Sequence, residues 1–202
     1  MSTLKESASD LNRRIAGRVR ELRAEQSLSL DALATKSEVS RSMPSLIERG
    51  ESSPTAGVLE KLATGLRVTL ASLFDAPKAM AHVPNGPLAR RKDQPQWQDP
   101  GSGYVRRNVS PPSVLQPIQI VEVHFPPGAR VAFETGARSQ RVHQQIWVLQ
   151  GMMDITLGNT RHRLREGDCL AMQLNHPTIF HNPTRKPARY AVVIASETPS
   201  RR

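Results

Sequence analysis

The chain of 202 residues lacks the features that secreted and membrane proteins usually carry. Its single cysteine, Cys169, cannot form an intrachain disulfide, which fits a reducing cytoplasm. No apolar run approaches the roughly 20 residues that a membrane-spanning helix needs. The first residues, MSTLKESASDLNRR, lack the apolar core of a secretion signal. These absences predict a cytoplasmic protein without a membrane partner.

Acidic residues are scarce relative to basic ones. Lys and Arg number 28 against 18 Asp and Glu, which gives a formal net charge of +10. An excess of this sign favours polyanionic partners, above all nucleic acid. The excess is uneven, because by our count it is +2 up to Lys78 and +8 from Ala79 onward. Net charge therefore supports a nucleic-acid partner without locating its site.

Apolar residues in the first part of the chain recur with helical spacing. Between residues 10 and 74 they lie three or four positions apart, as in the stripe of Leu11, Ile15, Val19 and Leu22. This periodicity predicts about five short helices.

Polar residues that favour helix N-termini stand where these helices are expected to begin. They are Ser29, Ser40, Thr55 and Thr69. Gly50 stands where a helix is expected to end.

The pattern changes after residue 76. Prolines interrupt the segment from Ala76 to Pro100, which predicts a linker that merges into the first edge strand of a second domain. After Gly103, short β-rich runs alternate with turn signals, which is typical of a sandwich or barrel. The strands expected are Ile118–Phe125, Gln145–Leu149, Met153–Leu157 and Ala191–Ile194. Cys169 is expected to be a small, buried strand residue.

The most informative stretch is SLDALATKSEVSRSMPSLIERGESSPT. Two short helices joined by a tight turn are expected, the first from Leu30 to Lys36 and the second from a cap at Ser40 to Arg49. Residues 37–39 would form the turn, with Val39 filling the angle between the helices. The segments VRELRAEQSLSLDALATKSEVSRS and LIERGESSPT resemble the DNA-binding domain of the Xre/Cro family, the phage-repressor type.

That resemblance implies a set of residues that contact double-stranded DNA. Arg41, Ser42 and Ser45 would face the bases from the recognition helix, and Leu46 on the same face would meet a thymine methyl group. Ser40 would cap this helix and Ser29, at the N-terminus of the preceding helix, would meet a phosphate. Such proteins bind DNA as homodimers, and each Ser or Arg here is also an ordinary cap or solvated residue in the absence of DNA.

Two positions depart from the family pattern, and one pair of residues follows it. Pro44 falls inside the recognition helix, which would then be kinked or begin later than the pattern indicates. Arg67 occupies a turn where the family often has Gly. The resemblance also implies an ion pair between Arg23 and Glu48 that locks the recognition helix against the first helix.

The run RVHQQIWVLQGMMDITLGNTRHRLREGDCLAMQLNHPTIFHNPT resembles the cupin barrel. In this resemblance the positions that usually supply metal ligands become Arg138, Gln140, Gln144 and Thr178. None is a good ligand for a transition metal, so no metal cofactor is expected. The four residues would instead line a polar, donor-rich site for a small organic effector. A displaced metal site using His143, His176 or His181 remains an alternative.

Together these features predict an α + β protein of two domains. A five-helix helix-turn-helix domain is expected over residues 9–76, a linker over 77–87, and a cupin-type antiparallel β-barrel (jelly roll) over 88–199. The function expected is that of a sequence-specific transcriptional regulator, not an enzyme, modulated by an effector in the barrel. Two alternatives stay open: a metal-dependent cupin enzyme fused to a DNA-binding domain, and a regulator whose barrel only dimerises.

Overall fold

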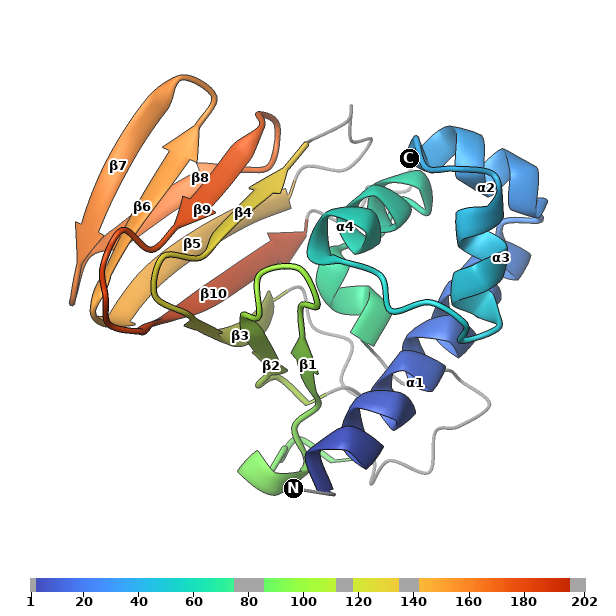
Figure 1. Cartoon of the computed structure of the whole chain (residues 1–202), viewed down its shortest axis with the longest axis horizontal. Coiled ribbons are helices and arrows are strands. Elements are labelled where there is room, and N and C mark those ends of the chain that lie inside the picture. Colours follow the sequence, from blue (N-terminus) through green and yellow to red (C-terminus); the bar gives the residue numbers. More distant parts are fainter. Residues whose placement is uncertain (1–2, 75–85, 112–117, 135–141, 197–202) are drawn as a thin grey trace.

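The computed structural model describes residues 3–74, 86–111, 118–134 and 142–196. The helical part lies to the right in Figure 1 and the strands to the left. Most of the expected linker, and the candidate effector residues Arg138 and Gln140, lie outside the described residues. No described helix is long and apolar enough to cross a membrane.

The helical part contains four α-helices and one 3₁₀ helix. They are α1 (Thr3–Glu25), α2 (Leu30–Ser37), α3 (Ser42–Glu48), α4 (Ala56–Gly65) and η1 (Leu70–Phe74). The prediction of five short helices is therefore wrong in detail, because α1 spans 23 residues and the last element is a 3₁₀ turn. The expected apolar stripe of α1 is confirmed, since Leu11, Ile15, Val19 and Leu22 are all buried.

Helix α4 packs closely against α2 because a glycine stands at their contact. A Cβ added to Gly65 would lie 2.1 Å from the hydroxyl oxygen of Ser37 and 3.1 Å from its backbone nitrogen. Only a residue without a side chain allows the two helices this approach. The position of α4, which faces the sandwich, is thereby tied to α2.

The strands form a sandwich of two antiparallel sheets (Figure 1). In the described residues the order is β1-β2-β3-β10-β5-β8 in the six-stranded sheet and β4-β9-β6-β7 in the four-stranded sheet, so the strands do not join into one closed sheet. Their bounds are β1 (Gln96–Gln98), β2 (Val105–Asn108), β3 (Ile118–Phe125), β4 (Arg130–Phe133), β5 (Val142–Gln150), β6 (Met152–Leu157), β7 (Thr160–Arg165), β8 (Cys169–Gln173), β9 (Thr178–His181) and β10 (Ala188–Ser196). All four expected strands are confirmed within a few residues, and β1 is the expected edge strand.

Alternation along each strand decides which side chains enter the core. On β3, the side chains of Val121, Val123 and Phe125 are buried in the core. Ile120, which alternates with them, is 39% exposed on the outer face. The same alternation corrects the prediction for Cys169, which is exposed. Cys169 pairs with Trp147 on the outer face of the six-stranded sheet, because Met172 takes the inward position on β8.

The helical part docks directly onto the sandwich. The backbone N–H of Ala56, in the first turn of α4, donates to Oδ1 of buried Asp99 at 2.8 Å. Lys61 pairs with Glu134 at 2.8 Å, and the rings of Phe74 and Trp97 lie 5.5 Å apart. Asp99 therefore helps to cap a helix of the other part of the molecule, since a carboxylate at a helix N-terminus satisfies an otherwise unbonded donor.

Candidate nucleic-acid interface and sandwich cavity

The segment from α2 to α3 has a short, well-defined turn. The Ser29 hydroxyl accepts a hydrogen bond from the Ala32 N–H and caps α2, as expected. Helix α2 ends where Glu38 adopts a left-handed conformation (φ 51°), and the N–H of half-buried Val39 donates to the Ala34 carbonyl at 3.1 Å. Val39 packs against the hydrophobic core, as expected for the residue between the helices. A pair of helices joined in this way is the geometry that presents the second helix to DNA.

Helix α3 begins one residue later than the sequence pattern indicates. Its first residue is Ser42 and its cap is Arg41, and no side-chain hydrogen bond closes that cap, so the prediction of Ser40 as the cap is wrong. The later start places Pro44 in the first turn of α3, where its missing N–H would have no intrahelical partner in any case. Pro44 is buried and α3 continues to Glu48, so the proline sets where the helix begins.

The residues proposed to meet DNA form one solvent-accessible face. Arg41, Ser40 and Ser42 are exposed, while Ser45 and Leu46 on the next turn are half-buried. The Ser45 hydroxyl accepts a hydrogen bond from Arg49 at 2.6 Å, and Arg49 also pairs with Glu51 at 2.8 Å. Arg41 is an exposed cation at the start of α3.

The expected ion pair between Arg23 and Glu48 is confirmed. Nε of Arg23 lies 2.6 Å from Oε1 of Glu48, and Nη2 lies 2.9 Å from Oε2, so the contact is bidentate. The Glu48 side chain is only 6% exposed, and its hydrogen bonds raise the pKa of Arg23 above its ordinary value. Arg20 adds a hydrogen bond to the Glu48 carbonyl at 2.6 Å. The pair fixes the end of α3 against α1.

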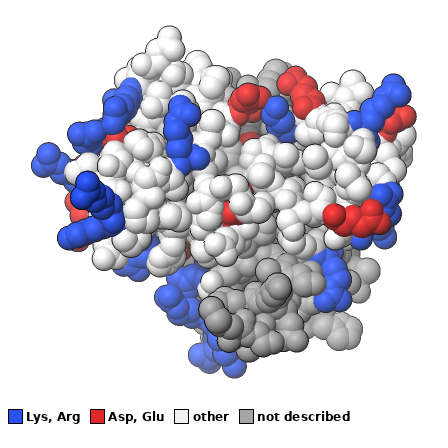
Figure 2. Space-filling view, viewed as in Figure 1, with Lys and Arg blue, Asp and Glu red and all other residues white. Residues whose placement is uncertain are grey.

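Positive charge gathers away from this face. Figure 2 shows Lys and Arg side chains clustered at the left edge, the region of β6 and β7 in Figure 1. There Arg161 and Arg163, each more than half exposed, both pair with buried Asp154, and Arg165 is exposed beside them. These exposed arginines belong to the sandwich, so the net charge of the chain does not single out the α3 face.

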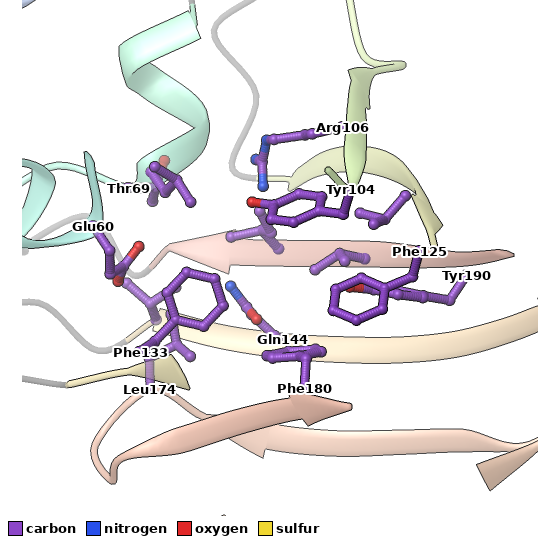
Figure 3. A pocket seen from close by; sticks show the side chains of 15 residues that line it. Glu60, Thr69, Tyr104, Arg106, Phe125, Phe133, Gln144, Leu174, Phe180 and Tyr190 are labelled. Carbon is purple, nitrogen blue, oxygen red and sulfur yellow. The ribbon is translucent and has the colours of Figure 1, made fainter. Parts of the chain in front are cut away.

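A cavity of about 60 Å³ lies between the two sheets, at the end where the helical part docks. Apolar and aromatic side chains supply most of its wall. Its lining residues are Glu60, Thr69, Leu70, Tyr104, Arg106, Val123, Phe125, Phe133, Val142, Gln144, Leu174, Phe180, Tyr190, Val192 and Ile194. Figure 3 shows Arg106, Thr69 and Glu60 above and beside an aromatic floor, with the Gln144 amide pointing up between them. Burial raises the pKa of Tyr104 and of Tyr190, so both hydroxyls stay protonated.

Comparison with known proteins decides the nature of the helical part. Residues 19–73 match the family HTH_3, described as helix-turn-helix. These residues are a helix-turn-helix domain. The curated protein "HTH-type transcriptional regulator SutR" of Escherichia coli (strain K12) is 39% identical over 70 residues, which are 35% of this chain and 39% of that protein. The chain thus matches about two fifths of the length of this relative, in the part that contains the helix-turn-helix domain.

Solved structures extend the likeness beyond the helix-turn-helix domain. An HTH_3 family transcriptional regulator from Vibrio cholerae covers 95% of this chain and 99% of its own, with a TM-score of 0.75 and 24% identity. At that identity the likeness concerns the fold, and it includes both parts of the molecule. The Cupin_2 domain of an XRE family transcriptional regulator from Enterobacter cloacae covers 47% of this chain and 98% of its own, with a TM-score of 0.43 and 14% identity.

Of the two expected effector residues that the structure describes, Gln144 lines the cavity and Thr178 does not. Thr178 is buried, but its hydroxyl donates to the His176 carbonyl at 3.1 Å and does not reach the cavity wall. Arg138 and Gln140 lie outside the described residues. Gln144 and Thr178 offer only neutral oxygens, so these two positions do not fit the transition metal that many cupins hold.

Two histidines of the alternative metal site, His143 and His181, lie on the outer sides of different sheets. His143 alternates with cavity-lining Val142 and Gln144 and so faces the outer side of the six-stranded sheet. His181 lies on the outer side of the four-stranded sheet, 3.9 Å from Asp154, because neighbouring Phe180 points inward. The two histidines therefore cannot hold one ion. Within the described ranges no group of three or more His, Cys, Asp or Glu is arranged to bind a metal.

Sequence reasoning missed the residues that give the cavity its charge. Arg106 belongs to β2 and Tyr104 immediately precedes it, in a region where no individual strand was predicted from the sequence. Glu60 and Thr69 come from the helix-turn-helix domain. The alternation of Tyr104 and Arg106 is the one available signal, since both would point to the same face of a strand.

Proposed function

We propose that this chain is a sequence-specific DNA-binding transcriptional regulator of the Xre type. The observation that carries the proposal is the α2–turn–α3 unit, held by the Arg23–Glu48 pair, with Arg41, Ser42 and Ser45 on one accessible face. Arg41 reads a guanine by its forked donors, and the Ser29 end of α2 meets a backbone phosphate. Ser40 and Leu46 complete the contact, the latter against a thymine methyl group.

The proposed regulator acts as a homodimer. Helix-turn-helix proteins of this kind place two recognition helices about 34–36 Å apart, one DNA turn, to read a pseudo-palindrome. An apolar patch on the outer face of the six-stranded sheet supports a contact between copies: Trp147 is 50% exposed, Ile118 49% and Ile120 39%. A two-fold interface uses one patch on both subunits.

The sandwich is proposed to be a cupin-type domain that binds a small-molecule effector. The cavity supports this part of the proposal, because enclosed, mostly apolar sites with a few polar groups are typical of ligand pockets. No catalytic role is assigned to it, since Gln144 and Thr178 provide no metal-binding group. The single cysteine is compatible with a cytoplasmic location.

The experiment that tests the function is selection of duplexes from a randomised pool by the full-length chain. The proposal predicts an enriched pseudo-palindrome with half-sites one turn apart, bound by two copies. Sedimentation of wild type and of I120E, which places a charge in the apolar patch, gives the state of the free protein. Recovery of unrelated sequences, or saturation by one copy per site, would contradict the proposal.

A further inference from the structure

The helix-turn-helix domain itself forms one wall of the sandwich cavity. Glu60 comes from α4, and Thr69 and Leu70 come from the start of η1, whereas the remaining lining residues belong to the sandwich. Figure 3 shows Glu60 and Thr69 on the helical side, across the cavity from Phe180 and Phe125. A molecule in this cavity would touch both domains at once.

The polar groups around the cavity are mostly hydrogen-bond donors. Arg106 offers a forked guanidinium, and the side chains of Gln144, Tyr104 and Tyr190 can each donate. Arg106 is only 6% exposed, and its guanidinium carbon lies 5.2 Å from the centre of the Phe74 ring, which holds it in the interface. Such a donor set suits a ligand that accepts hydrogen bonds, and the fork matches the geometry of a carboxylate.

Among the described residues that line the cavity, Glu60 is the only acidic one. Arg106 would attract an anionic ligand, whereas the carboxylate of Glu60 would repel it at short range. The two charged residues therefore make opposite predictions. Loss of Arg106 should weaken binding of a carboxylate, and neutralisation of Glu60 should strengthen it.

The volume limits the size of the occupant. A water molecule needs roughly 10–15 Å³ on this measure, so about 60 Å³ accommodates on the order of five non-hydrogen atoms. The floor of Phe125, Phe180 and Val192 favours an apolar body. A short branched or linear carboxylic acid meets both requirements.

We propose that the cavity binds a small aliphatic carboxylate, with its charged end on Arg106, and that the bound ligand holds the helix-turn-helix domain against the sandwich. This inference rests on the proposed function and names its effector class and its mode of regulation. Affinity for the ligand and docking of the domain are linked, because a molecule that contacts both parts binds the docked arrangement more tightly than the undocked one.

Contacts around the cavity connect the docked domain to the proposed DNA-reading face, which is the accessible face of α3 together with the N-terminus of α2. The Thr69 hydroxyl lies 3.2 Å from Oε1 of Gln119 on β3, and α4 is anchored at its start by Asp99. Helix α4 in turn contacts α2 at Gly65. Helix α4 therefore joins the cavity wall and its Asp99 anchor to α2, the first helix of the helix-turn-helix pair.

The first test compares two probes of the same shape, isobutyrate and the neutral amide isobutyramide, by calorimetry on the full-length chain. Isobutyrate should bind about tenfold or more tightly than the amide, since a hydrogen bond to a charged group is stronger than a neutral one. R106M should lose at least that factor, R106K should lose part of it, and E60Q should gain affinity. Equal binding of the two probes, no binding of either, or unchanged affinity in R106M would overturn the ligand class.

The second test measures docking through Trp97, which is 5% exposed at the domain interface. The chain has two tryptophans, so W147F leaves Trp97 as the single reporter. Isobutyrate should reduce acrylamide quenching of Trp97, and T69V should diminish both the effect and the affinity. T35V, on the exposed face of α2, is the matched control and should change neither. Tight binding without a change in quenching would overturn the link to docking.

The two proposals can fail separately. A wild-type chain that binds isobutyrate and protects Trp97 but selects no duplex would contradict the proposed function and leave a carboxylate site without a DNA output. A chain that selects a pseudo-palindrome but shows no response to isobutyrate would overturn the inference and leave DNA binding intact.

Discussion

The DNA-reading face and the sandwich cavity differ in how they are built. The first is an exposed surface whose residues come from one stretch of chain, Ser29 to Leu46. The second is a concave cavity, and its wall runs from Glu60 in one domain to Ile194 in the other. Reading a base needs a few side chains free to reach outward, whereas holding a small molecule needs walls on all sides. Helix α4 connects the two regions, because its Glu60 lines the cavity and its Gly65 contacts α2.

The largest loss of stability is expected when the Glu48 carboxylate, which supports the DNA-reading face, is removed. E48A leaves the Arg23 guanidinium without its bidentate partner in a partly buried place, which should cost about 3 kcal/mol of unfolding free energy. Urea unfolding of the full-length chain measures this loss. E51A is the matched control, because its pair with Arg49 is exposed to solvent and should contribute far less to stability. Equal losses in the two variants would contradict a structural role for Glu48.

The link between the two regions is cut by D99A. The buried N–H of Ala56 then loses its acceptor, which should cost roughly 1–3 kcal/mol and loosen α4 from the sandwich. Calorimetric melting should change from a single transition to two, with the helix-turn-helix domain unfolding first. S102A removes only a bond within the Asp99 loop and should keep one transition. A single, unshifted transition in D99A would show that the domains dock without this cap.

The stability of the sandwich is expected to depend on pH through Asp154. Hydrogen bonds from Arg163 and Arg161 hold the pKa of buried Asp154 below its ordinary value. The stabilisation is therefore fully present above the unfolded pKa of about 4 and is lost as pH falls through the folded value.

D154N should thus be less stable than wild type at neutral pH by roughly 1–3 kcal/mol, with the gap closing in acid. Melting temperatures between neutral pH and strongly acidic pH measure the gap. D93N, at an exposed position, should run parallel to wild type throughout. A stability difference between D154N and wild type that stays constant into acid would show that the loss comes from altered packing and not from the missing charge.

The smallest effect expected is a gain of stability from R67G. Arg67 has a φ of 54° just after α4, and its N–H and that of Val68 close the end of the helix on Thr64 and Ala63. Glycine adopts this conformation without a Cβ clash, so unfolding should cost up to about 1 kcal/mol more. R67A keeps the strain and should show no gain. Equal melting of R67G and R67A would contradict this reading.

The helical part was largely predictable from local rules. The stripe from Leu11 to Leu22 and the caps at Ser29 and Thr55 depend on residues whose spacing along the chain fixes their spacing on a helix. The Arg23–Glu48 pair joins two helices and was predicted from the family resemblance instead. The error at Ser40 has a physical reason. Pro44 cannot donate an N–H within the helix, so α3 starts where the proline falls in its first turn.

The cavity was largely unpredictable for the opposite reason. Its residues share no spacing, because Glu60, Arg106 and Tyr190 meet only through the packing of a helix and two strands far apart in the chain. Gln144 was predicted because the resemblance to the cupin barrel assigns it a usual ligand position, and the structure places it on β5 facing the cavity. Cys169 was misplaced because a short strand between two turns leaves its inward face ambiguous until its partner, Trp147, is known.

The account depends most on Arg41 at the start of α3, and one measurement tests that dependence directly. The affinities of wild type and R41A are compared on the selected duplex and on duplexes with each base pair changed in turn, at a fixed salt concentration. R41A should lose about 1–3 kcal/mol on the selected duplex and should stop discriminating at one position in each half-site. A uniform loss at every position would indicate a phosphate contact. Affinity and selectivity equal to wild type would contradict the assignment of the α3 face.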